Sequence, residues 1–172
     1  MTRKFWGGND FPLTGFRAPV PSAIRIIVHM NEPSDLPGRY AVAVDTRDAD
    51  GVAALFTPDA EFVQPPALTR GAGEVVTVGA AAIAAAVLGA TAHLKGTHHA
   101  VHQVVVDVVE DDASAVVYCL AHHLYVGRDG AARDNAVAIR YLDTYRRVDG
   151  RWLIARRALA VDFTEDRAVT LP

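Results

Sequence analysis

The sequence has little or nothing of several features that would point to a particular class of protein. Its 172 residues include a single cysteine, Cys119, so no disulfide can form within the chain. Its 17 lysines and arginines are balanced by 20 aspartates and glutamates, and the two signs are interspersed, which argues against nucleic acid as a partner. No Gly-x-Gly-x-x-Gly loop occurs, so nucleotide binding has no support.

Long hydrophobic runs are also missing. No stretch of roughly 18 apolar residues is free of charges or helix breakers, so a membrane span is not predicted. The most apolar run, residues 75–94, is dominated by alanine and glycine and favours a strand followed by a helix. Arg3 and Lys4 are not followed by an apolar segment of signal-peptide length, and with the single cysteine this favours the cytoplasm.

The hydrophobic spacing predicts helices first and long strands second. Leu36, Tyr40 and Val44 are four residues apart and indicate a first helix, and a second is expected over residues 48–56. The rest of the chain predicts a helix over 79–88 and strands over 60–63, 74–78, 97–109, 113–126, 136–148 and 152–163. This order predicts an α+β fold with helices on one face of a curved antiparallel sheet that ends in a long meander.

Three segments of different character divide the chain. Residues 1–33 are rich in proline and have little periodicity, so we expect an N-terminal arm there. The regular pattern predicts one domain over residues 34–165, followed by a tail over 166–172.

Two parts of the sequence resemble the SnoaL-like branch of the nuclear transport factor 2-like superfamily. They are Tyr40-Ala-Val-Ala-Val-Asp45-Thr-Arg-Asp48 and Tyr141-Leu-Asp143-Thr-Tyr145-Arg-Arg147. The resemblance covers residues 35–163 and implies a cone-shaped, cystatin-like α+β barrel with a mostly apolar pocket. Some members are dehydratases, cyclases or isomerases and others have no chemistry of their own, so the fold alone does not give a function.

The motifs are most similar to those of scytalone dehydratase and the bile-acid dehydratases. Tyr40 and Asp45 have the separation of a tyrosine and an aspartate in the bile-acid enzymes, and Asp45 and His99 have that of the catalytic couple in scytalone dehydratase. Val44 stands where scytalone dehydratase has a tyrosine, and Tyr141 where it has a pocket asparagine. These departures argue against scytalone itself as the substrate.

Asp45 lies among apolar residues on a helix that must pack on the sheet, so its carboxylate needs a partner. We predict His99 as that partner, because a carboxylate on one ring nitrogen leaves the other free as a general base. The alternative is a surface aspartate at the end of the helix.

The face of the sheet on which each histidine lies depends on the alternation of side chains along the strands and on the position of one turn. Alternation places His99 and Gln103 on the same face of their strand. If Asp111 is the centre of the hairpin turn, His99 lies opposite His123, and a shift of half a residue would place His122 or Leu124 there instead.

The resemblance and the residues together predict a cofactor-independent lyase or isomerase, specifically a dehydratase for a small apolar cyclic, polyketide-like or steroid-like molecule. We predict that Asp45 orients His99, Tyr40 holds a carbonyl oxygen, and His123 protonates the leaving hydroxyl, directly or through water. Tyr40 as a core residue is the alternative reading. We expect the pocket to be lined in part by Tyr141, Phe56 and Gln103.

We expect no cofactor and no metal ion, although five histidines occur within residues 98–123. The histidines at 98 and 102 are too far apart along a strand to share an ion, and no His-Glu-x-x-His motif adds ligands. Valine-rich strand faces predict a homo-oligomer, a dimer or trimer. A non-catalytic module that binds a small hydrophobic molecule or takes part in assembly is the alternative to an enzyme.

Overall fold

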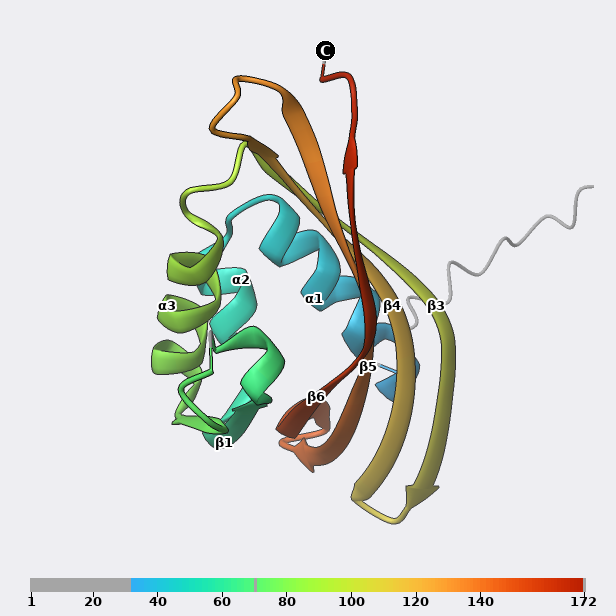
Figure 1. The fold of residues 1–172 in the computed structure, drawn as a ribbon. Coiled ribbons are helices and arrows are strands. Elements are labelled where there is room, and N and C mark those ends of the chain that lie inside the picture. The colour runs from blue at the N-terminus through green and yellow to red at the C-terminus, as the bar shows by residue number, and fades with distance from the viewer. Residues whose placement is uncertain (1–31, 70, 172) are drawn as a thin grey trace, which may run out of the picture.

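Three helices lie on the concave side of a curved six-stranded sheet in the computed structural model, which describes residues 32–69 and 71–171 (Figure 1). After a 3-10 turn, η1 (Pro33–Asp35), the helices are α1 (Leu36–Asp45), α2 (Ala49–Ala53) and α3 (Ala80–Thr91). The strands are β1 (Phe56–Gln64), β2 (Val75–Val78), β3 (Gly96–Val109), β4 (Asp112–Val126), β5 (Ala132–Val148) and β6 (Arg151–Ala168), and η2 (Pro66–Leu68) follows β1. The predicted arm lies outside the described residues except for its last two.

The strand order β2-β1-β6-β5-β4-β3 confirms the predicted α+β class. β3 to β6 form the expected antiparallel meander, and β1 joins it by parallel pairing with β6. Among the described strands β2 and β3 are free edges, so the sheet is curved but does not close into a barrel. None of the described helices is long and apolar enough to cross a membrane.

The helices follow from local sequence with two corrections. Leu36, Tyr40 and Val44 are buried and form the predicted apolar stripe of α1. The second helix is shorter than expected: Asp48 caps it by accepting a hydrogen bond from the Gly51 amide, and it ends at Ala53. Phe56 begins β1 instead, because its backbone pairs with β6.

Small side chains on β4 leave room between the sheet and the helices. The buried, inward-facing residues of this strand are Ala113, Ala115, Val117, Cys119 and Ala121. Cys119 is therefore a small core residue. Large side chains on the facing elements fill most of the space, and what remains is a cavity, described below.

The outer face of the sheet keeps large apolar side chains in solvent, among them Val105, Val116, Tyr118, Leu142 and Phe163. Such a surface supports association between copies. The homo-oligomer stays a prediction.

Candidate active site

Asp45 and His99 come together where the end of α1 meets the start of β3. His99 Nδ1 lies 2.7 Å from Asp45 Oδ1, and the His99 backbone amide donates to Asp45 Oδ2 at 2.8 Å. The Thr97 hydroxyl donates to Oδ1 at 2.8 Å. Both oxygens of the carboxylate are thus occupied by β3, which fixes the first residues of this strand against α1.

These hydrogen bonds keep Asp45 ionised. Partial burial by itself would raise the pKa of Asp45, but the hydrogen bonds from His99 and Thr97 outweigh it and lower this pKa from 3.8 to about 2. An ionised carboxylate accepts, so His99 Nδ1 donates its hydrogen to Asp45 when the ring is neutral. The lone pair of the neutral imidazole is then on Nε2, which has no hydrogen-bond partner among residues 32–69 and 71–171.

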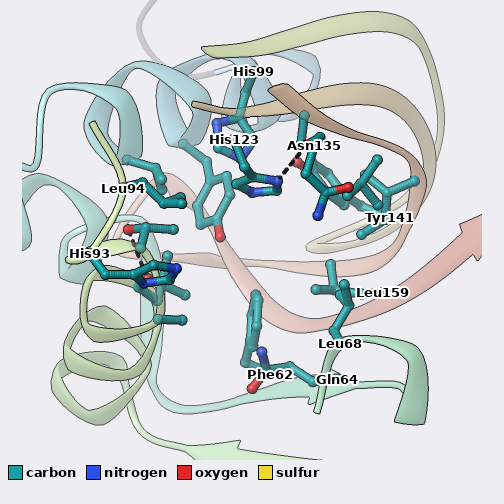
Figure 2. A pocket seen from close by; sticks show the side chains of 18 residues that line it. Phe62, Gln64, Leu68, His93, Leu94, His99, His123, Asn135, Tyr141 and Leu159 are labelled. Carbon is teal, nitrogen blue, oxygen red and sulfur yellow. Dashed lines mark hydrogen bonds between the residues drawn. The ribbon is translucent and has the colours of Figure 1, made fainter. Parts of the chain in front are cut away.

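The His99 ring lies in the wall of a cavity of about 270 Å³ between the sheet and the helices (Figure 2). This volume is just under the lower end of the range typical of small-molecule sites, roughly 300 to 1,000 Å³, and fits a ligand of one or two rings. Apolar lining residues include Val44, Phe62, Leu68, Val87, Val137, Ile139 and Leu159. The polar lining residues are Tyr40, Gln64, Thr91, His93, His99, His123, Asn135 and Tyr141.

His123 faces the same cavity, although it is not directly opposite His99. The β3–β4 turn is centred between Glu110 and Asp111, and His99 pairs with Ala121 while Thr97 pairs with His123. His123 is therefore one diagonal step away on the same face, with its ring centroid 6.1 Å from that of His99 and the two rings nearly perpendicular.

Burial keeps His123 neutral, and a hydrogen bond sets which of its ring nitrogens carries the hydrogen. Its Nδ1 lies 3.2 Å from the backbone oxygen of Asn135, so Nδ1 donates. Burial lowers the pKa of His123, and the nearby imidazole of His99 lowers it further. Its neighbour His122 points to the other face of the sheet, where Nδ1 contacts Asp134 Oδ2 at 2.7 Å.

Tyr40 and Tyr141 line the cavity and enclose a buried arginine. The Arg157 guanidinium carbon lies 4.3 Å from the ring centroid of Tyr40 and 4.1 Å from that of Tyr141. Arg157 also makes a bidentate ion pair with Asp143, with nitrogen–oxygen distances of 2.9 and 2.6 Å. Burial raises the pKa of Tyr40 to about 12 despite the opposing effect of Arg157, so its hydroxyl keeps its proton at neutral pH.

Two predicted pocket residues lie elsewhere. Phe56 is 3% exposed and packs edge-to-face on Tyr40, with ring centroids 6.1 Å apart, but it does not line the cavity. Gln103 is exposed, because the β3–β4 register shifts between Val101 and Val104. This bulge inserts one residue into β3 and reverses the alternation of its side chains after it. The prediction that His99 and Gln103 lie on the same face of the strand was therefore wrong.

Sequence reasoning missed His93 and Asn135. Asn135 pairs with His123 in the β4–β5 register, so correct pairing of these strands would have placed it at the cavity. His93 lies in the connection between α3 and β3, where no regular periodicity predicts the direction of a side chain. Within the described residues, no group of three or more His, Cys, Asp or Glu side chains is arranged to hold a metal ion.

The sheet is open and curved, helices cover its concave face, and His99, held by Asp45, lies in the wall of the cavity between them. The chain belongs to the SnoaL-like domain family, whose sequence model matches residues 32–158. None of the curated proteins compared with the chain matches it.

Three solved structures from Novosphingobium aromaticivorans are similar to the chain. One, provisionally named scytalone dehydratase, is 27% identical with a TM-score of 0.64, over 78% of this chain and 85% of that one. Another, provisionally named aromatic ring hydroxylase, is 30% identical with a TM-score of 0.62, over 78% and 89%. A third, described as a nuclear transport factor 2-like protein with a cystatin-like fold, is 27% identical with a TM-score of 0.58, over 76% and 80%.

Proposed function

We propose that this protein is a cofactor-independent lyase that dehydrates a small cyclic ketone carrying a hydroxyl two carbons from its carbonyl carbon. The observation that carries the proposal is the 2.7 Å contact between Asp45 and His99, which leaves His99 Nε2 free at the wall of a largely apolar cavity. The similarity to the structure provisionally named scytalone dehydratase supports the same reaction type.

The first step is removal of a proton from the carbon beside the carbonyl. His99 Nε2 accepts this proton, and the electron pair of the C–H bond moves to form an enolate. The Asp45 carboxylate stabilises the resulting imidazolium through the hydrogen bond from Nδ1. Because Asp45 stays ionised down to a pH of about 2, this stabilisation is present at neutral pH.

The negative charge of the enolate develops on the carbonyl oxygen, which needs a hydrogen-bond donor. Tyr40 lines the cavity and keeps its phenolic proton at neutral pH, so it is the donor that we propose. The cationic Arg157 stacked on its ring favours this role, since it makes the hydroxyl a better donor.

The second step is loss of the hydroxyl group. The enolate electrons form the carbon–carbon double bond, the C–O bond breaks, and the hydroxyl leaves as water with the proton that His99 carried. Neutral His123 holds the hydroxyl in place by accepting its hydrogen bond at Nε2, because Nδ1 donates to Asn135. This role differs from the protonation by His123, directly or through water, that the sequence suggested.

The test is turnover of 3-hydroxy-1-tetralone, whose loss of water gives fluorescent 1-naphthol. We expect the wild-type chain to produce naphthol and His99→Ala to lower kcat/KM about 100- to 10,000-fold, the usual contribution of a general base. His102→Ala is the matched control, since His102 is an exposed histidine of the same strand outside the cavity. Circular dichroism checks that the variants fold.

Wild-type turnover by His99→Ala would refute the proposed base. The mostly apolar lining supports a second candidate, a module that binds a small hydrophobic ligand without chemistry. Tight binding of 1-naphthol without turnover of any hydroxylated cyclic ketone, and with no loss of binding in His99→Ala, would favour that candidate.

A further inference from the structure

The mouth of the cavity is formed by the end of α3 and the residues that follow it. Of the 18 residues that line the cavity, only Ala90 and His93 are exposed. Figure 2 shows His93 extending from the end of α3 toward the space that His123 faces from the sheet. Among the described lining residues, His93 is therefore the one polar residue that is exposed to solvent rather than buried or half-buried.

The backbone around His93 is held by Arg47. The Arg47 guanidinium donates to the backbone oxygen and to the hydroxyl of Thr91, both at 2.9 Å, and to the backbone oxygen of Leu94 at 3.4 Å. These contacts lie on both sides of His93. The Lys95 amide donates to the backbone oxygen of Leu124 at 2.7 Å and fixes the end of the same connection to β4.

Acidic side chains are absent from the described segment that forms the mouth. No acidic residue occurs between positions 80 and 106, and the segment around His93 is held by the positively charged Arg47. None of the 18 lining residues is an aspartate or glutamate in the described part of the chain. A negatively charged ligand group beside His93 would thus meet an imidazole donor and no carboxylate of the cavity lining.

We propose that His93 binds a carboxylate at the end of the ligand that projects from the mouth, which makes it a specificity-determining residue and Arg47 its positioning residue. The ligand class is a small cyclic ketone with a carboxylate on the side remote from the reacting carbon. That the ligand is a ketone rests on the proposed function, whereas its carboxylate is inferred from the residues at the mouth alone. The ring occupies the apolar interior and the carboxylate stays near solvent, which avoids the desolvation of a buried charge.

Two probes that differ only in the carboxylate test this inference without any turnover. They are 1-tetralone and its derivative with a carboxylate on the aromatic ring at carbon 6, titrated into the full chain by calorimetry. We expect the acid to bind wild-type protein about tenfold more tightly, the lower end of the effect of a hydrogen bond to a charged group. His93→Ala should remove this preference and leave the affinity for 1-tetralone within about twofold.

Further variants separate His93 from general effects of charge. His93→Gln keeps a donor and should retain part of the preference, and His102→Ala, an exposed histidine outside the cavity, should retain all of it. Arg47→Met should raise the rate of amide hydrogen exchange of residues 92–95. It should also weaken binding of the acid more than binding of the ketone. Equal affinities for the two probes in wild-type protein, or an unchanged preference in His93→Ala, would overturn the inference.

The same measurements distinguish this inference from the proposed reaction. If 3-hydroxy-1-tetralone is turned over by the wild type but not by His99→Ala, and no carboxylate preference is found, the proposed dehydration is supported and the role of His93 is refuted. A preference for the acid that depends on His93, without turnover of any hydroxylated ketone, would keep the carboxylate site and remove the reaction.

Discussion

Replacing Asp45 by asparagine should move the hydrogen of the neutral His99 ring from one nitrogen to the other while nearly keeping the size and shape of the side chain. In the native protein one carboxylate oxygen accepts from the His99 backbone amide and the other accepts from Nδ1 of the ring and from Thr97. Asparagine has only one accepting oxygen. If that oxygen faces the backbone amide, the new NH₂ group faces Nδ1, which must then become an acceptor.

The opposite orientation of the asparagine would place two donors, its NH₂ group and the His99 amide, against each other at a native separation of 2.8 Å. The first orientation is therefore preferred, and it moves the neutral ring's hydrogen from Nδ1 to Nε2. The nitrogen that faces the cavity then carries a hydrogen and cannot accept a proton. The imidazolium also loses its charged partner.

The expected loss of kcat is about 1,000- to 10,000-fold, because the same change beside the histidine of a Ser-His-Asp triad costs about 10⁴-fold through the wrong tautomer. This loss corresponds to about 4 to 5.5 kcal/mol of transition-state stabilisation. The assays are naphthol formation from 3-hydroxy-1-tetralone and long-range proton–nitrogen NMR of the His99 ring. A folded Asp45→Asn variant with native turnover, or with its hydrogen still on Nδ1, would refute the reasoning.

Three further predictions concern stability and the second histidine. The pKa of Asp45 is lowered from 3.8 to about 2, so its stabilisation is present above pH 4 and is lost as the pH falls through 2. Urea unfolding should show wild type losing about 1 kcal/mol more than Asp45→Asn over this range, a value that allows for the exposure of Asp45. Arg157→Met strands the buried Asp143 and should lower the free energy of unfolding by about 3 to 5 kcal/mol, most of it recovered in Arg157→Met/Asp143→Leu; equal stability of both variants would contradict this. His123→Gln should retain more turnover than His123→Ala if His123 acts as an acceptor, whereas equal loss in both variants would favour a proton donor.

The helical and strand patterns predicted the fold class, whereas the pairing of Asp45 with His99 also needed the resemblance to the dehydratases. The spacing of Leu36, Tyr40 and Val44 fixes which side of α1 is buried, and Asp45 follows directly at the end of this stripe. Four long β-type runs with short connections leave a meander as the simplest arrangement. These patterns placed Asp45 at the end of a buried helix and His99 at the start of the first long strand, and the resemblance paired the two residues.

The errors arose where one residue changes the geometry of everything after it. The bulge between Val101 and Val104 leaves His99 facing inward and turns Gln103 outward, and nothing in a valine-rich run signals the inserted residue. The end of α2 was predicted wrongly for a different reason. Leu55 and Phe56 continue a helical apolar pattern, but pairing with β6 overrides that local preference.

The cavity could not be predicted from the sequence either, because its walls come from separate elements that one turn holds together. Thr46, Arg47 and Asp48 follow α1, and Arg47 has a φ of 60°, a conformation that is uncommon for residues other than glycine. This conformation lets the turn present two anchors two residues apart: the Asp45 carboxylate holds the start of β3, and the Arg47 side chain holds the end of α3. Glycine at position 47 would adopt the backbone more easily but would lose the second anchor. With arginine at position 47 the turn fixes the wall with His99 and the mouth with His93 relative to each other.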